Sequence, residues 1–133
     1  MESKVLLIDD DHMTNYLHKR VISKASLTSS IIVSTNGKEG IEELLKIEDA
    51  DLDNIKSKVI IFLDINMPVM DGWTFLEVFK EIKNKLNFEI NIFVLSSSIN
   101  PDDKARAEKN SFVTKYINKP LNKESISYLK SYF

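Results

Sequence analysis

The sequence contains no cysteine, so the chain cannot form disulfides, offer a thiolate nucleophile or bind zinc or an iron–sulfur cluster through cysteine. This absence is compatible with a reducing cytoplasm, where we expect the protein to be. Positive charge is not in excess either, because 18 Lys and Arg residues face 20 Asp and Glu residues, for a formal net charge of -2. The chain has no bulk positive field to hold nucleic acid or anionic lipid, and we expect neither as a partner.

Long hydrophobic runs are also missing. The longest run, residues 59–63, is far shorter than the ~20 residues that a membrane-spanning helix needs, so we expect no membrane insertion. The first residues, Met-Glu-Ser-Lys, lack the basic segment and apolar stretch of a secretion signal. No repeat, low-complexity tract or Pro/Gly/Ser linker divides the chain, and its length predicts one domain over residues 1–133.

Short β-branched runs alternate with segments whose apolar residues recur at helical spacing. The runs predict strands at 5–8, 31–33, 59–63, 90–95 and 112–117. The helical patterns predict five helices, each with one apolar face. Four of these faces are formed by Met13, Leu17 and Val21; by Ile41, Leu44 and Leu45; by Phe75, Phe79, Ile82 and Leu86; and by Ile126, Leu129 and Phe133. The fourth helix in chain order, at 102–110, has only two alanines for its inner face, and Pro101 fits its first turn. We expect residues 46–58 to bulge from the surface. The alternation predicts a five-stranded parallel sheet covered on both faces, a doubly wound α/β domain.

Polar residues follow four of these strands where each strand ends. They are Asp9, Asp10 and Asp11 after the first, Asp64 and Asn66 after the third, Ser96 and Ser97 after the fourth, and Lys119 after the fifth. We expect them to meet, because ligands of open α/β sheets bind outside the carboxyl ends of the strands. Clustered carboxylates repel one another unless a cation compensates, and oxygen ligands suit Mg²⁺ or Mn²⁺. With a lysine and a hydroxyl to hold phosphoryl oxygens, the set predicts phosphoryl chemistry on an Asp nucleophile.

Other polar and aromatic residues have ordinary structural interpretations. Asp11 is expected to cap the first helix. His12 and His18 have no acidic or hydroxyl partner at metal or triad spacing, and we expect both on the helix surface. Tyr16 and Trp73 are expected to pack against the core rather than to act as stacking platforms.

The strands and the polar residues at their ends resemble the receiver domain of two-component response regulators, over essentially the whole chain. The resemblance is carried by residues 6–10 (Leu-Leu-Ile-Asp-Asp), 62–72, 95–97 (Leu-Ser-Ser) and 116–120 (Tyr-Ile-Asn-Lys-Pro). It implies a flavodoxin-like, CheY-like fold with strand order 2-1-3-4-5. It also implies a signalling phosphoprotein, not an enzyme, which catalyses only its own phosphoryl transfer and dephosphorylation.

The resemblance implies a role for each acidic residue. Asp64 matches the phosphoacceptor, while Asp9, Asp64 and the backbone carbonyl of Asn66 match the ligands of Mg²⁺, with Mn²⁺ as a substitute. Asp10 would contact the ion directly or through water.

It also implies the roles of the remaining residues and the partners. Ser96 and Lys119 would bind the phosphoryl group, Ser96 and Tyr116 would form the switch, and the Lys119–Pro120 bond is expected to be cis. The phosphodonor would be a histidine kinase or a histidine phosphotransfer protein. A downstream protein would bind the fourth helix, fifth strand and fifth helix. Because no output domain follows the last predicted helix, we expect a stand-alone receiver.

Three other classes share part of the pattern. A phosphatase of the haloacid dehalogenase type needs a second Asp two residues after the nucleophile, where this chain has Asn66. A flavodoxin-like flavin carrier needs a Ser/Thr/Gly-rich phosphate loop where this chain has Asp9, Asp10 and Asp11. A pseudo-receiver that works without phosphorylation is expected to lack part of the acid, hydroxyl and lysine set, and nothing is missing here.

Overall fold

The computed structural model describes residues 3–28, 30–50, 58–67, 70–97 and 100–133. The elements are β1 (Ser3–Ile8), α1 (His12–Lys24), β2 (Ser30–Ser34), α2 (Gly37–Ala50), β3 (Lys58–Asp64), α3 (Gly72–Ile82), η1 (Lys83–Lys85), β4 (Glu89–Ser96), α4 (Pro101–Lys109), β5 (Val113–Asn118), α5 (Lys123–Leu129) and η2 (Lys130–Tyr132), where η1 and η2 are 3₁₀ turns. All five expected strands are present. No helix within these ranges is both long and apolar enough to cross a membrane.

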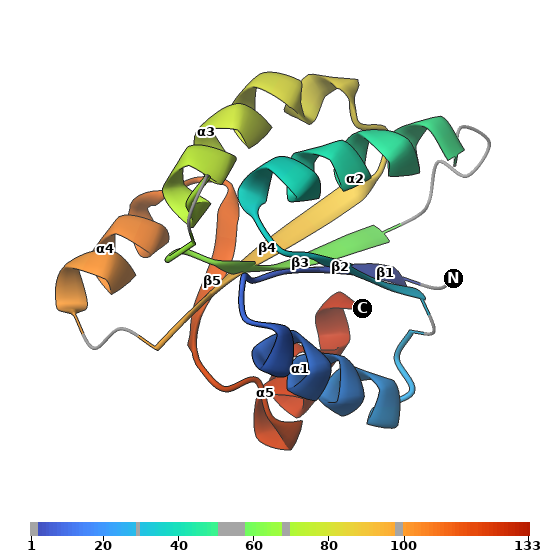
Figure 1. Cartoon of the computed structure of the whole chain (residues 1–133), viewed down its shortest axis with the longest axis vertical. Coiled ribbons are helices and arrows are strands. Elements are labelled where there is room, and N and C mark those ends of the chain that lie inside the picture. Colours follow the sequence, from blue (N-terminus) through green and yellow to red (C-terminus); the bar gives the residue numbers. More distant parts are fainter. Residues whose placement is uncertain (1–2, 29, 51–57, 68–69, 98–99) are drawn as a thin grey trace.

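The five strands form one parallel sheet in the order β2-β1-β3-β4-β5. Figure 1 shows α2, α3 and α4 on one side of this sheet and α1 and α5 on the other. The expected fold class, including the strand order, is therefore confirmed. Because the order places β1 and β3 side by side at the centre, the loops after them meet in the middle of one edge.

Each face of the sheet has its own apolar core, since side chains alternate between the faces along a strand. Phe93 and Leu95 of β4 pack in the core beneath α1 and α5, together with Ile126 and Leu129. Ile92 of β4 packs on the opposite face, in the core formed with α2 and α3. The central strands β1 and β3 are buried on both faces, which is why they read as continuous apolar runs.

The orientation of α1 differs from the expected one. Met13 and Leu17 are 63% and 48% exposed, and Tyr16 is 60% exposed, so the interpretation of all three as packing residues is wrong. The residues that α1 buries are Asn15, His18 and Ile22. Burial of the two polar residues is tolerated because both have hydrogen-bond partners, described below.

Two further expectations need correction. The segment at 46–58 begins as helix, because α2 continues to Ala50; residues 51–57 lie outside the described ranges. In α4 only one of the two alanines faces inward, since Ala107 is fully buried and Ala105 is exposed. The N-cap role of Asp11 and the place of Pro101 in the first turn of α4 are confirmed.

Candidate functional site

The polar residues after the strands meet at one edge of the sheet, as expected from its parallel topology. Asp9 follows β1, Asp64 is the last residue of β3, Ser96 is the last residue of β4 and Lys119 follows β5. All of these strands run in the same direction with their ends in register. Residues far apart in the sequence are therefore brought together by the sheet itself.

The centre of this edge is an acidic cluster. Asp9, Asp10 and Asp64 each present a carboxylate oxygen, and these oxygens all lie within 4.8 Å of one another. Asp9 and Asp64 are only 4% and 5% exposed, whereas Asp10 faces solvent. Carboxylates this close repel one another, so the cluster favours a positive charge beside it.

One such charge comes from Lys119. Its Nζ lies 2.6 Å from Asp9 Oδ2 and 3.4 Å from Asp64 Oδ1, and its side chain is 17% exposed. A single ammonium thus bridges the two buried carboxylates. The cluster contains three carboxylates, and two of them contact Lys119.

The pKa directions follow from this arrangement. Burial raises the pKa of the Asp64 carboxyl above its ordinary value, the adjacent Asp9 raises it further, and Lys119 offsets only part of the rise. Burial alone would lower the pKa of the Lys119 ammonium, but its contacts with Asp9 and Asp64 outweigh burial and the pKa is raised. The lysine stays charged, and Asp64 still lacks part of the compensation that its carboxylate needs.

The donor set fits a hard divalent cation. Mg²⁺ takes oxygen ligands, keeps several of its waters and commonly uses one or two protein carboxylates. Here two buried carboxylates lie beside an exposed one, so waters have access on the side of Asp10. A bound cation would also supply the positive charge that Lys119 alone does not.

The loops after β1 and β3 hold the two buried carboxylates by hydrogen bonds from their own backbone. The N–H of Asp11 donates to Asp9 Oδ1 at 3.0 Å, and the N–H of Asn66 donates to Asp64 Oδ1 at 3.2 Å. Asn66 itself is exposed. Both carboxylates are therefore oriented before any ligand arrives.

Gly72, the first residue of α3, allows a close approach to the same loop. Its N–H donates to the Ile65 carbonyl at 3.2 Å, and a Cβ at this position would lie 2.7 Å from Ile65 Cα and 2.8 Å from the Asp64 carbonyl oxygen. Only a residue without a side chain fits against this backbone. The start of α3 is thereby packed directly onto the segment that carries Asp64.

Ser96 and Tyr116 lie close to Lys119. Both line a cavity of about 490 Å³ that also contacts Lys119 and the first turn of α4. Ser96 is fully buried and its carbonyl accepts the N–H of Lys119 at 2.9 Å, whereas Tyr116 is half-buried and Ser97 is exposed. The Lys119–Pro120 peptide bond is cis, as expected.

His18 is not a surface residue, which corrects the expectation for this histidine, whereas His12 is exposed as expected. The His18 side chain is 2% exposed, and its Nε2 accepts the backbone N–H of Leu121 at 3.1 Å. Asn15, one turn earlier on α1, was not expected near the site, yet its Nδ2 donates to the Asp9 carbonyl at 2.8 Å. One signal was present in the sequence: Asn15 and His18 precede the apolar Ile22 by seven and four residues, so all three share a helix face.

Known proteins with this architecture carry the same arrangement of strands. Chemotaxis protein CheY4 of Vibrio cholerae aligns over the full length of both chains with a TM-score of 0.71 at 24% identity, which shows the shared fold. A two-component response regulator from Cytophaga hutchinsonii is 34% identical, with a TM-score of 0.81 over 98% of this chain and 95% of that one. The class that the fold defines is the CheY-like α/β domain.

The sequence profile of the response regulator receiver domain matches residues 5–129, so the chain belongs to that family of two-component signalling domains. The probable C4-dicarboxylate response regulator DctR of Bacillus subtilis is 32% identical over 123 residues, which are 92% of this chain and 48% of that protein. The chain spans about half or less of the length of the curated relatives it matches. The expected extent of the domain, 1–133, and its stand-alone status stay predictions.

Proposed function

We propose that this receiver domain accepts a phosphoryl group on Asp64 in a Mg²⁺-dependent reaction and then signals to a partner protein. The observation that carries the proposal is the buried Asp64 carboxylate, held beside two further carboxylates with Lys119 Nζ 3.4 Å away. An acceptor carboxylate and an adjacent cation are two of the groups that support phosphoryl transfer to Asp.

In the proposed step, one Asp64 oxygen forms a bond to phosphorus. The bond between phosphorus and the imidazole nitrogen of the donor's phosphohistidine breaks, and that nitrogen keeps the electron pair and takes a proton from solvent. The product is an acyl phosphate on Asp64. Lys119 and the Ser96 hydroxyl are proposed to contact the phosphoryl oxygens, whose negative charge and acceptor capacity match an ammonium and a hydroxyl.

Asp9, Asp10, Asp64 and the backbone carbonyl of Asn66 are proposed to hold the cation. When bound, Mg²⁺, or Mn²⁺ in its place, neutralises charge on the phosphoryl oxygens. The chain's own carboxylates keep Lys119 charged and directed at Asp64, independently of the ion.

The switch is proposed to be the movement of Ser96 and Tyr116 with the phosphoryl group. Both residues line the same cavity of about 490 Å³ beside α4, so space for rearranged side chains is already present. The helix α4 is weakly held, because Ala107 is its one buried residue. An element with little buried apolar surface shifts at low free-energy cost.

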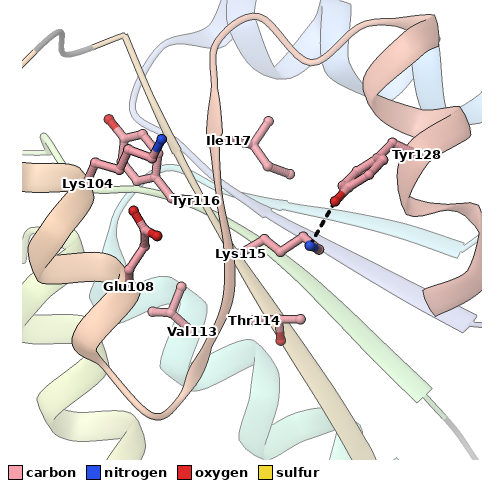
Figure 2. Close-up of a pocket in the computed structure, with 8 residues that line it drawn as sticks. All are labelled: Lys104, Glu108, Val113, Thr114, Lys115, Tyr116, Ile117 and Tyr128. Carbon is pink, nitrogen blue, oxygen red and sulfur yellow. Dashed lines mark hydrogen bonds between the residues drawn. The ribbon is translucent and has the colours of Figure 1, made fainter. Parts of the chain in front are cut away.

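The downstream partner is proposed to bind the face formed by α4, β5 and α5. A cavity of about 350 Å³ lies on this face. Figure 2 shows Lys104 and Glu108 of α4 on one side of it and Tyr128 of α5 on the other. Lys115 of β5 joins β5 to α5, since its Nζ donates to Tyr128 Oη at 2.9 Å. Because Tyr116 lines both this cavity and the one beside Ser96, a change of its position alters the face directly.

The phosphodonor is proposed to be a histidine kinase or a histidine phosphotransfer protein that docks next to the acidic cluster. The exposed side of α1 supports this, since Met13, Tyr16 and Leu17 form an apolar patch on the helix that directly follows Asp9 and Asp10. Exposed apolar patches on a domain mark sites of protein contact. A cytoplasmic location, where such donors act, stays part of the proposal.

Phosphoramidate tests the chemistry, because its P–N bond matches that of phosphohistidine. With Mg²⁺ we expect one phosphoryl group per chain, stable in acid and lost in base or hydroxylamine, and no labelling with EDTA. Asp64→Asn should abolish labelling, and the matched control Asp71→Asn, at the N-cap of α3, should retain it. Equal labelling of Asp64→Asn and the parent would show that Asp64 is not the acceptor.

A further inference from the structure

Two buried polar side chains of α1 are not used by the proposed chemistry. Asn15 is 4% exposed and His18 is 2% exposed, and both face the sheet. Polar groups in such positions cost stability unless they are bonded, so their contacts indicate what they do.

Each of the two side chains is bonded to a backbone segment that carries a site residue. Asn15 Nδ2 donates to the carbonyl of Asp9 itself, at 2.8 Å. His18 Nε2 accepts the N–H of Leu121 at 3.1 Å, a contact between residues 103 positions apart in the chain. The helix thus joins the end of β1 to the segment after β5.

The segment after β5 positions the side chain of Lys119. On one side, the N–H of Lys119 donates to the Ser96 carbonyl at 2.9 Å. On the other side, two residues further on, the N–H of Leu121 donates to His18. The backbone that carries the ammonium is therefore fixed at both ends, once by β4 and once by α1.

The contact at Leu121 requires a specific state of the imidazole. A ring nitrogen that accepts a hydrogen bond has no proton, so Nδ1 of the neutral ring is the protonated nitrogen. Burial lowers the pKa of His18, which favours this neutral form. An apolar side chain of similar size would fill the space without offering an acceptor, and would leave the Leu121 N–H unpaired.

We propose that His18 is a positioning residue for phosphoryl transfer: by accepting the Leu121 N–H, it holds the Lys119 segment so that the ammonium reaches Asp64 and the incoming phosphoryl group. This inference rests on the proposed function and adds a residue to it. His18 acts through Lys119 and does not itself contact the reacting atoms.

The test compares His18→Leu, which lacks an acceptor, and His18→Met, whose thioether is only a weak acceptor, with His18→Gln, whose amide oxygen can accept the same N–H. At saturating Mg²⁺ and phosphoramidate, we expect both apolar variants to be phosphorylated about tenfold more slowly, because small misplacements of catalytic groups have effects of this order or larger. We expect His18→Gln to remain within about threefold of the parent. The Mg²⁺ dissociation constant, followed by Trp73 fluorescence, should change less than about twofold in all three, since the ligands stay in place.

A matched control separates positioning from a general loosening of α1. Ile22→Val removes one methylene from the fully buried Ile22, which lies on the same face of α1. We expect this variant to be less stable than the parent but phosphorylated at the parent's rate. An equal loss of rate in Ile22→Val would overturn the positioning role.

Two readouts do not depend on activity. In the parent, ¹⁵N chemical shifts of the ring should show Nε2 of His18 unprotonated at neutral pH, and the Leu121 amide should exchange with solvent at least about tenfold more slowly than in His18→Leu. A protonated Nε2 would overturn the inference even if the apolar variants failed to fold. A parent that is not labelled on Asp64 would refute the proposed function, whereas a labelled parent with equal rates in His18→Leu would refute only the role of His18.

Discussion

Asp64→Asn should stabilise the protein in the absence of magnesium. Burial raises the pKa of the Asp64 carboxyl, and Asp9 adds to the rise, so the ionised carboxylate is held in the folded state at a cost. A folded-state pKa above the unfolded value means that ionisation at neutral pH lowers the free energy of unfolding. Asparagine keeps the size and shape of the side chain without the charge.

The magnitude follows from the distances at the cluster. At an effective dielectric constant of ~20, repulsion between Asp64 and Asp9 oxygens within 4.8 Å is about 3.5 kcal/mol or more. Attraction between Asp64 Oδ1 and Lys119 Nζ at 3.4 Å is about 5 kcal/mol by the same rule. The repulsion and the attraction nearly cancel once the screened repulsion from the exposed Asp10 is included. The cost of burying the charged carboxylate then remains, so we expect the free energy of unfolding of Asp64→Asn to be about 1–2 kcal/mol higher than that of the parent.

Urea denaturation in EDTA and in saturating Mg²⁺ is the assay. A ligand at one hundred times its dissociation constant stabilises the folded state by about 2.7 kcal/mol, so magnesium should make the parent the more stable of the two proteins. Magnesium should stabilise Asp64→Asn much less than the parent, because the variant lacks one carboxylate ligand. Asp71→Asn, with the same chemical change on the neighbouring loop, should follow the parent in both buffers.

Two results would contradict this prediction. If Asp64→Asn is no more stable than the parent in EDTA, the ion pairs of Lys119 fully compensate the buried carboxylate, and the site has no deficit of positive charge for a cation to fill. If magnesium stabilises the parent and Asp64→Asn equally, the ion binds elsewhere.

Three further predictions concern the surroundings of the site. The folded-state pKa of His18 lies below its ordinary value of 6.5, so the stability that its neutral form provides is complete above that pH and is lost as the pH falls further. Urea denaturation across this range should therefore show a flatter dependence of the free energy of unfolding on pH for His18→Gln than for the parent; equal pH profiles would contradict this. Gly72→Ala should lower the free energy of unfolding by about 1–3 kcal/mol and weaken Mg²⁺ binding, since its Cβ would lie 2.8 Å from the Asp64 carbonyl oxygen. Unchanged results in a urea titration and in a Mg²⁺ titration would contradict the close packing. Ala107→Gly, at the one buried position of α4, should cost about 1 kcal/mol and speed amide exchange mainly within α4, whereas uniform exchange changes would argue against a separately held helix.

The fold and the convergence of the site residues could be predicted because short sequence patterns identify the strands, and a parallel sheet places the ends of its strands at one edge. Continuous apolar runs such as 59–63 are typical of strands buried on both faces, and parallel strands must end at a common edge. Asp9, Asp64 and Lys119 each come at or directly after a strand end, so topology alone brings them together. Their contacts, including the bridge by Lys119 Nζ, agree with the expected convergence.

The orientation of α1 was not predictable from the hydrophobic pattern. Met13 and Leu17 are at the spacing of a core-facing stripe but lie exposed, and the polar His18 takes the inward position. His18 Nε2 accepts the backbone N–H of Leu121, and the sequence around His18 does not identify a hydrogen-bond partner 103 residues away. Apolar spacing alone therefore did not show which face of α1 packs against the sheet.

The long-range contact between α1 and the segment after β5 bears on how the protein is made. A ribosome synthesises β1 and α1 long before Leu121, which follows its partner His18 by 103 residues. Until β5 joins the edge of the sheet, a nascent chain holds the carboxylates of the cluster without the ammonium of Lys119. We therefore expect partial chains to be poor phosphoryl acceptors, so that a cell's donors act only on molecules whose synthesis has passed β5.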